Sequence, residues 1–440
     1  MNTPNQNQTR NQTTARDEFA RMLLTGMWDA GVKAASVAGL FRKSLPPRPA
    51  GRIVVVGAGK AAAAMAAAVA DVYGPAVEGV VVTRHGHGLK PGESSGAIKI
   101  IEARHPVPDA AGLEAGRAVL QSVAGLSADD LVLCLLSGGG SALLEQPLPG
   151  IRLDDITALN KRLLDSGAAI SEINCVRKHI SAIKGGGLAL AAWPARVVTL
   201  AISDVPGDDP SVIASGPTVP DPTTAADARA ILRRYGIAAP PNVSAVLDSA
   251  QYETPKSSDP RLTNCEYRLV ATQADALRAG AAVAREAGFK VVNRGTGIEG
   301  EARIVAGEEA QLALGYAESG APVAILGGGE LTVTLDRRGS GGPSREYALA
   351  LALALKEHPR IWALAADTDG IDGTDDGAGA IVTPDTLKRA RQGGLDPSAA
   401  LRDHDSGVFF ATVGDAIVTG PTRTNVSDFR VMLIFGTTSA

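Results

Sequence analysis

Short apolar runs alternate with helical stretches along most of the chain. Continuous β-branched or leucine-rich runs occupy residues 53–56, 80–83, 99–101, 131–136 and 197–202. Helical patterns lie between them, for example at residues 60–72 and 112–124. Strands without a polar face are typical of parallel sheets that helices cover on both sides. The pattern therefore predicts an α/β domain in the first half of the chain.

The same alternation of apolar runs and helical stretches returns after a segment of different composition. Residues 238–264 are rich in Pro, Ser and Asp and have little periodicity, which indicates a linker. Beyond them the pattern predicts strands at 267–271, 289–293, 322–326 and 361–366, and helices at 275–287, 301–316 and 344–356. Residues 331–335 alternate apolar and polar positions, as a strand with one wet face does.

These patterns predict the domain organisation. We expect an N-terminal α/β domain at 17–240, a linker at 241–264 and a C-terminal α/β domain at 265–440. A cleft between two such domains is the usual place for a small-molecule site. Residues 1–16 are polar and lack the apolar core of a signal peptide, so we expect a disordered tail.

Composition excludes several classes of protein. The 440 residues include 43 Lys and Arg against 47 Asp and Glu, so the net charge of −4 argues against a nucleic-acid or anionic-membrane partner. No apolar run reaches the length of a membrane span. Cys134, Cys175 and Cys265 fit neither a disulfide framework nor a zinc set, which favours the cytoplasm. The 50 glycines favour tight turns between strands and helices.

The first candidate for chemistry is the turn after residues 53–56. Gly57 and Gly59 permit a tight turn, and the next helix would offer free N–H groups to an anion. Lys60 lies in the first helical turn, where a cation opposes the macrodipole, so a nearby anion would explain it. The spacing also approaches a dinucleotide fingerprint, but no acid follows for a ribose diol. Arg84 could instead suit the 2′-phosphate of NADP.

The second candidate follows the apolar run at 131–136. Three glycines between two serines would expose several backbone N–H groups around one anion. The residues of this predicted phosphate cradle are Ser137, Gly138, Gly139, Gly140 and Ser141.

Cations and carboxylates form two further candidates in the first domain. Arg177 and Lys184 share a helix face that ends at a second triple glycine, so they suit a polyphosphate or carboxylate together with Gly185 and Gly186. Asp204 leaves the strand at 197–202, and Asp208 follows in a Pro/Gly-stiffened loop. Carboxylates at the carboxyl edge of a sheet can hold Mg²⁺, so we expect a metal at Asp204 and Asp208.

The second domain offers oxygen-rich and glycine-rich turns. Glu330 follows a third triple glycine at 327–329, and Asp369 lies in the acidic segment DTDGIDG. Thr422 and Asn425 belong to a polar loop near the C-terminus. All four side chains suit a polar ligand. The spacing of the acidic segment matches part of a calcium loop, but the other ligand positions do not follow.

Seven motifs taken together resemble class II glycerate 2-kinase, the family with a C-terminal MOFRL region. They are GAGKAA, LLSGGGSALL, INCVRKHISAIKGG, SDVPGDDPSVIASGPTVPDPT, GGGELTVT, DTDGIDG and TGPTRTNVSD. The resemblance covers nearly the whole chain from residue 17. It implies two Rossmann-like α/β domains with mostly parallel sheets and an active-site cleft between them. It also implies ATP-dependent phosphorylation of D-glycerate to 2-phosphoglycerate, with Mg²⁺ or another divalent cation.

The resemblance also assigns residues. Lys60 matches the active-site lysine of the family. The family segment GGRNQE is GGPSRE here, so Pro343 stands at the arginine position and Arg345 follows two places later. We expect Lys60, Asp204 and Arg345 to be catalytic, and a homodimer is the candidate assembly. Similar proteins are also labelled hydroxypyruvate reductase, an NAD(P)H-dependent alternative for which His85 or His105 would be the proton donor.

Overall fold

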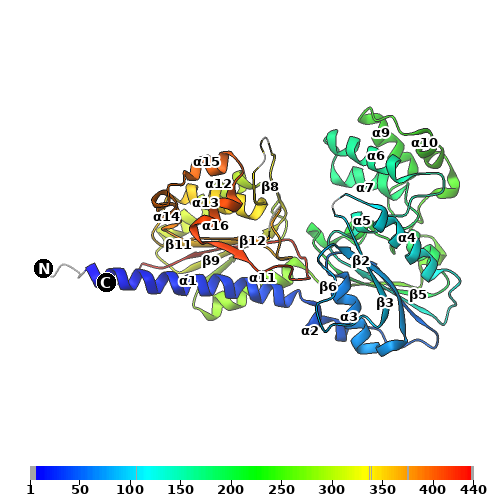
Figure 1. Cartoon of the computed structure of the whole chain (residues 1–440), viewed down its shortest axis with the longest axis horizontal. Coiled ribbons are helices and arrows are strands. Elements are labelled where there is room, and N and C mark those ends of the chain that lie inside the picture. The colour runs from blue at the N-terminus through cyan, green and yellow to red at the C-terminus, as the bar shows by residue number, and fades with distance from the viewer. Residues whose placement is uncertain (1–5, 106, 336, 338, 374–375, 438–440) are drawn as a thin grey trace. The chain divides into compact units, whose positions relative to one another are not determined.

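The computed structural model describes residues 6–437, apart from residues 106, 336, 338, 374 and 375. The chain forms two compact units, each with its own six-stranded sheet (Figure 1). One unit is Val37–Ala271, and the other combines Met1–Ser36 with Thr272–Ala440. The predicted α/β class with two domains is confirmed. Within the described residues, no helix is long and apolar enough to cross a membrane.

The sheet of the unit Val37–Ala271 is entirely parallel, in the order β3-β2-β1-β4-β5-β6. Its strands are β1 (Ile53–Ala58), β2 (Val77–Arg84), β3 (Ala97–Ala103), β4 (Leu131–Leu136), β5 (Arg196–Ile202) and β6 (Cys265–Ala271). The strand order runs outward from β1 to β3 and then resumes on the other side of β1 with β4. Ligands of such sheets bind outside the carboxyl ends of the strands at this reversal. The sheet therefore directs attention to the loops after β1 and β4.

Helices cover this sheet and add a layer of their own. The helices that pack near the sheet are α2 (Val37–Ser44), α3 (Ala62–Tyr73), α4 (Ala110–Val123), α5 (Gly140–Leu143) and α8 (Gly187–Ala192). Four more lie together beyond it (Figure 1): α6 (Leu153–Asp165), α7 (Ile170–Lys178), α9 (Ala225–Arg234) and α10 (Pro241–Leu247). This helical layer has a separate apolar core that includes Leu159, Leu163, Val176 and Ile231. The sequence patterns did not predict it as a separate layer.

The sheet of the second unit is mixed, in the order β13-β12-β11-β14-β9-β7. Its strands are β7 (Lys290–Asn293), β9 (Val323–Gly329), β11 (Ile361–Asp367), β12 (Gly377–Val382), β13 (Ala416–Val418) and β14 (Asp428–Ile434), and β8 (Gly300–Glu301) pairs with β10 (Leu331–Thr332) outside it. β7 and β9 are parallel, whereas every other pair in this sheet is antiparallel. The prediction of mostly parallel strands is therefore wrong for this unit, because strands buried on both faces look alike in either direction.

Helices cover both faces of the mixed sheet. They are α1 (Gln6–Ala34), α11 (Gln273–Glu286), α12 (Ala302–Glu318), α13 (Pro343–Leu355), α14 (Thr386–Gln392), α15 (Pro397–Arg402) and α16 (Ser406–Val413). Helices α1 and α11 pack against one face through Leu24, Met27 and Leu277 (Figure 1). Helices α12 and α13 pack against the other face through a core of many alanines and leucines.

Three expected boundaries differ in the structure. Residues 6–16 of the expected tail belong to α1, because the apolar face of the same helix is anchored on α11 and supports its polar start, and residues 1–5 lie outside the described residues. The expected linker at 241–264 contains α10, whose Val243 and Leu247 are buried in the core of the helical layer. Strand β6 completes the parallel sheet beside β5, although the Pro- and Ser-rich segment before it suggested a new domain.

Candidate active site

The turn after β1 is fastened to the loop after β4. The N–H of Lys60 donates to Gly138 O at 2.9 Å, and the N–H of Ala61 donates to Ser137 Oγ at 3.0 Å. The N–H of Ala62 donates back to Gly59 O at 3.0 Å. The expectation that this turn offers free N–H groups is therefore wrong for residues 60–62, because neighbouring chain segments already accept them.

Close packing explains why glycine occupies positions 57 and 59. A Cβ on Gly57 would clash with the carbonyl of Leu135, and one on Gly59 would clash with the hydroxyl of Ser137. Both glycines also have positive φ angles, of 159° and 135°. They let β1 and the loop after β4 approach closely, and their predicted contact with phosphate stays a prediction.

The loop Ser137–Ser141 differs from the first turn in its backbone donors. Ser137 N is held by Ala58 O at 3.1 Å, and Ser141 Oγ lies 2.9 Å from Ser215 Oγ. Within the described part of the chain, the N–H groups of Gly138 and Gly139 donate to no acceptor. Gly139 has a φ of 82° and is partly exposed. Two uncommitted N–H groups at the strand-order reversal form a candidate anion site.

The second triple glycine is committed to the fold. Gly185 N donates to Ser215 O at 2.9 Å, and Gly186 N donates to Gly216 O at 2.8 Å. A Cβ on Gly186 would lie 2.5 Å from Pro255 Cγ. These two glycines therefore connect their own loop to the loop at residues 215–216. Their role as phosphate ligands stays a prediction.

Ala214 and Ser215 are conspicuous residues that the sequence reasoning missed. Their φ angles are 50° and 60°, in the left-handed region that non-glycine residues rarely adopt. They lie against the candidate anion site, since Ser215 contacts Ser141 and a Cβ on Gly140 would meet Ala214. Backbone strain of this kind often occurs at functional sites. The amino-acid types at these two positions do not indicate a left-handed conformation.

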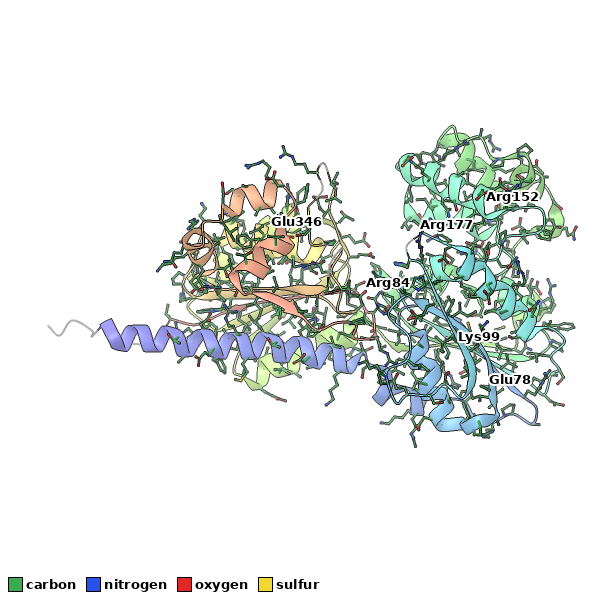
Figure 2. The ribbon with its side chains drawn as sticks, in the orientation of Figure 1. Glu78, Arg84, Lys99, Arg152, Arg177 and Glu346 are labelled. Atoms are coloured by element: carbon green, nitrogen blue, oxygen red, sulfur yellow. The ribbon has the colours of Figure 1, made fainter. Side chains whose placement is uncertain are left out.

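The expectation that Arg177 and Lys184 share a helix face is wrong, because α7 ends at Lys178 and Lys184 lies in the turn beyond it. The Lys184 side chain is 1% exposed, and its ammonium donates to Glu145 and to Leu144 O, the latter at 3.3 Å. Burial lowers the pKa of Lys184, opposed by the charge of Glu145. Arg177 donates to Asn160 Oδ1 at 2.9 Å, and burial lowers its pKa too. Arg177 lies at the end of α7 on the side of the helical layer nearer the sheet (Figure 2).

The predicted metal ligands follow β5, the neighbour of β4. Asp204 is half-buried two residues beyond the strand, and Asp208 ends a short 3₁₀ turn with a φ of 55°. No group of three or more His, Cys, Asp or Glu side chains in the described ranges could hold a metal ion. A Mg²⁺ ion here would therefore take most of its ligands from phosphate oxygens and water, as Mg²⁺ commonly does.

The candidate residues of the second unit meet at one edge of its sheet. Because β14 runs antiparallel to β9 and β11, its start lies beside their ends. Thr422 N donates to Asp369 O at 2.9 Å, and Asn425 Oδ1 accepts from Ser427 N at 3.2 Å. Glu330 directly follows β9. The structure thus brings Glu330, Asp369, Thr422 and Asn425 to the same edge. Gly327–Gly329, which the sequence suggested as a turn, is instead the end of a strand.

Arg345 is buried near the start of α13. Its Nε lies 3.0 Å from the carboxylate of Asp372, and Nη2 donates to Asp372 O at 2.5 Å. The same carboxylate accepts from the N–H of Ser344 and of Arg345, both at 2.9 Å. Burial raises the pKa of Asp372 to about 6, although Arg345 opposes the shift. The guanidinium thus holds Asp372, and its expected replacement of the family arginine stays a prediction.

The two histidines considered for a reductase lie in different surroundings. The exposed His85 places Nδ1 3.7 Å from Glu102. The ring of His105 lies against the candidate anion site, since a Cβ on Gly139 would be 3.0 Å from its Cδ2 and 3.1 Å from its Nε2. The loop after β3 therefore reaches Gly139, which the sequence pattern of β3 alone did not indicate.

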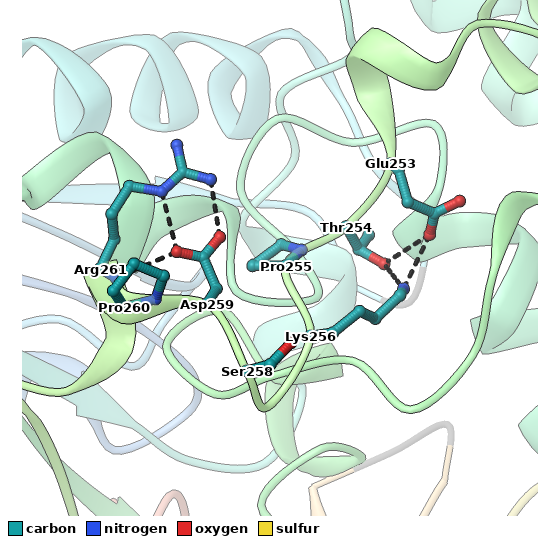
Figure 3. Close-up of a pocket in the computed structure, with 8 residues that line it drawn as sticks. All are labelled: Glu253, Thr254, Pro255, Lys256, Ser258, Asp259, Pro260 and Arg261. Atoms are coloured by element: carbon teal, nitrogen blue, oxygen red, sulfur yellow. Dashed lines mark hydrogen bonds and ion pairs between the residues drawn. The ribbon is translucent and has the colours of Figure 1, made fainter.

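A pocket of about 440 Å³ adjoins the second triple glycine (Figure 3). Its lining residues are Glu253, Thr254, Pro255, Lys256, Ser258, Asp259, Pro260 and Arg261. Lys256 Nζ lies 2.7 Å from Glu253 Oε1, and Arg261 Nη2 lies 2.6 Å from Asp259 Oδ2. Its two cations are therefore already paired with carboxylates, which makes this pocket a weaker anion site than Gly138 and Gly139.

The fold and the loop Ser137–Ser141, with its two uncommitted N–H groups, define an α/β protein with a candidate anion site where the strand order reverses. Residues 23–248 match the model of "Domain of unknown function (DUF4147)", and residues 323–428 match the MOFRL family. The chain belongs to the class II glycerate 2-kinase family, as its motifs predicted. The three cysteines are free thiols.

Named relatives cover most of the chain. "D-glycerate 2-kinase" of Thermotoga maritima is 40% identical over 89% of this chain and 93% of its own length. A crystal structure of glycerate kinase from Thermotoga maritima is 38% identical, with a TM-score of 0.85 over 95% of this chain and 100% of that one. A protein of Agrobacterium vitis named "Putative hydroxypyruvate reductase" is 52% identical over 96% of both chains.

Proposed function

We propose that the protein is a glycerate 2-kinase, which transfers the γ-phosphoryl group of ATP to the 2-hydroxyl of D-glycerate. The observation that carries the proposal is the pair of uncommitted N–H groups at Gly138 and Gly139, beside the turn that bears Lys60. Backbone N–H groups in such loops bind phosphate oxygens. The named glycerate kinases in the family supply the substrate class.

The chemistry asks mainly for positioning and neutralisation of charge, because phosphoryl transfer passes through a loose transition state. In the proposed mechanism, the N–H groups of Gly138 and Gly139 hold phosphate oxygens. The half-buried Lys60 places its ammonium near the transferred phosphoryl group or the carboxylate of glycerate. Asp204 orients the 2-hydroxyl and accepts its proton, while the hydroxyl oxygen forms the new O–P bond and the bond between the γ-phosphorus and the ADP oxygen breaks.

The carboxylates after β5 can bind a divalent cation only if the nucleotide phosphates supply further ligands. We propose that Asp204 and Asp208 hold Mg²⁺ together with phosphate oxygens and water. The ion would supply charge stabilisation to the phosphates. Glu330, Asp369, Thr422 and Asn425 stay proposed ligand-binding residues of their own unit, and Arg345 stays a proposed catalytic residue.

The reductase alternative has the name of the Agrobacterium vitis relative in its favour. A dinucleotide fingerprint uses the first N–H groups of the helix to bind a pyrophosphate. Here the N–H groups of Lys60, Ala61 and Ala62 donate to Gly138, Ser137 and Gly59. That geometry favours the kinase.

One experiment separates the two activities. The purified protein is assayed with D-glycerate, Mg²⁺ and ATP, and in parallel with hydroxypyruvate and NADPH. We expect ADP to form only when glycerate is present, and phosphorus NMR to show an ester at carbon 2. NADPH consumption without ADP formation would contradict the proposal, and an ester at carbon 3 would contradict the stated product.

Assembly and location are proposals of the same kind. We propose a homodimer, which light scattering of the purified chain tests directly. The free thiols of Cys134, Cys175 and Cys265 suit the reducing cytoplasm that we propose as its location.

A further inference from the structure

We propose that His87 is a positioning residue for Lys60, so its kinetic test rests on the proposed kinase function. His87 lies three residues beyond the end of β2 and is 1% exposed. Its Nδ1 lies 3.3 Å from the carbonyl oxygen of Lys60. A carbonyl oxygen can only accept, so Nδ1 carries the proton and donates. The Thr83 hydroxyl, 3.5 Å from the same oxygen, is at the limit of a hydrogen bond.

The opposite side of Lys60 is held as well. Its N–H donates to Gly138 O at 2.9 Å, and the next N–H, of Ala61, donates to Ser137 Oγ at 3.0 Å. The main chain of Lys60 is therefore fixed between the segment after β2, through His87, and the loop after β4.

Through this arrangement, the buried His87 affects which positions the ammonium of Lys60 can occupy. The lysine side chain has four rotatable bonds, so the main chain that carries it sets where its ammonium can go. A displacement of about 1 Å at a reacting group can cost about 10²-fold in rate. The bond from His87 and the bond from the Lys60 N–H to Gly138 O together hold the Lys60 main chain beside Gly138 and Gly139, whose N–H groups are the proposed phosphate ligands. His87 needs no contact with substrate to affect the reaction.

Three variants isolate the hydrogen bond. His87→Asn keeps an amide donor near the position of Nδ1, whereas His87→Leu removes the donor. His87→Gln is a second loss variant, because its longer side chain moves the amide away from that position. His179→Leu is the matched control, because His179 is also 1% exposed and its Nδ1 lies 2.8 Å from the carbonyl of Cys175.

The kinetic readout is a double-mutant cycle with Lys60→Met. We expect His87→Leu to lower kcat about 10- to 10²-fold. We expect no further loss in the Lys60→Met background, because a residue that acts through Lys60 has nothing left to position there. His87→Asn and His179→Leu should keep kcat within about threefold of the wild type, while His179→Leu lowers Tm. A role confined to stability would lower kcat equally in both backgrounds, which would overturn the proposal.

A second readout requires no turnover. An acylating reagent labels exposed amines, and peptide mass spectrometry compares Lys60 with the exposed Lys99 (Figure 2). We expect His87→Leu and His87→Gln to change the labelling rate of Lys60 relative to Lys99, and His87→Asn and His179→Leu to leave it unchanged. Identical Lys60 labelling in all variants would overturn the proposal. If the wild type makes no ADP with glycerate, the proposed kinase function fails, and this readout alone decides the role of His87.

Discussion

Lys184→Met tests whether the most deeply buried predicted cation serves the fold or the substrate. The side chains of Lys184 and Glu145 are 1% and 4% exposed. Within the described residues, Glu145 Oε1 has no hydrogen-bond partner, so the carboxylate depends on Lys184 for its compensation. Removing one partner of a buried ion pair typically costs about 3–5 kcal/mol, because the other charge stays buried. Methionine keeps the apolar stem, so we expect the free energy of unfolding to fall by about that amount.

The double variant Lys184→Met/Glu145→Leu separates the two roles. Replacing a whole buried pair by apolar side chains is often neutral or stabilising, so we expect stability within about 2 kcal/mol of the wild type. Urea unfolding, followed by hydrogen exchange of peptides from β4 and β5, reads the stability of this unit alone. Kinetics on the same samples read the chemistry, and we expect kcat/KM of the double variant within about tenfold of the wild type.

Two results would refute this reasoning. A double variant as unstable as Lys184→Met would show that the burial of an unpaired carboxylate is not the cause of the loss. A stable double variant that has lost about 10²-fold or more in kcat/KM would show that the ammonium acts on developing charge. The second result would support the original prediction that Lys184 binds phosphate.

The remaining predictions concern a cation, a glycine and a carboxylate. Lys60→Met should lower kcat by about 10²–10³ and change stability by about 0.5 kcal/mol or less, and near-native kcat/KM in an ADP-coupled assay would contradict its role. Gly139→Ala should destabilise by about 1–3 kcal/mol in urea unfolding and raise KM for ATP, because its φ is 82° and the new Cβ would lie 3.0 Å from His105. Burial raises the pKa of Glu253, but hydrogen bonds and the charge of Lys256 outweigh it and lower the pKa from 4.5 to about 2. A lowered carboxylate pKa stabilises the fold above about pH 4.5 and loses this contribution as the pH falls toward 2. Because the side chain is 35% exposed, Glu253→Gln should cost only about 1 kcal/mol at pH 7 and flatten the acid limb of the stability curve, which urea titrations at pH 7 and pH 3 measure.

The first sheet was predictable in outline because its strands are continuous apolar runs. The run at 131–136 coincides with β4, and the run at 197–202 lies within β5. The edge strand β6 was assigned to the wrong domain, since its half-buried side chains carry little pattern. Strand direction in the second sheet was not predictable from burial, because apolar strands such as β11 and β14 are buried on both faces whichever way they run. Direction there depends on the connections, such as the short one that returns the chain from β11 to the antiparallel β12.

The candidate site was less predictable than the fold, because the same sequence of three glycines occurs for different physical reasons in different places. The sequence GGG occurs at 138–140, 185–187 and 327–329, and each was expected to turn the chain around a ligand. In the first segment, two N–H groups stay uncommitted within the described residues, whereas in the second the carbonyls of Ser215 and Gly216 accept them. The third segment ends β9 and pairs with β14. Glycine is required wherever another segment approaches too closely for a Cβ, and that segment can be distant in the sequence. What singles out the loop at 138–140 is its place beside the strand-order reversal, so the order of the strands carries the functional information that the glycines alone do not.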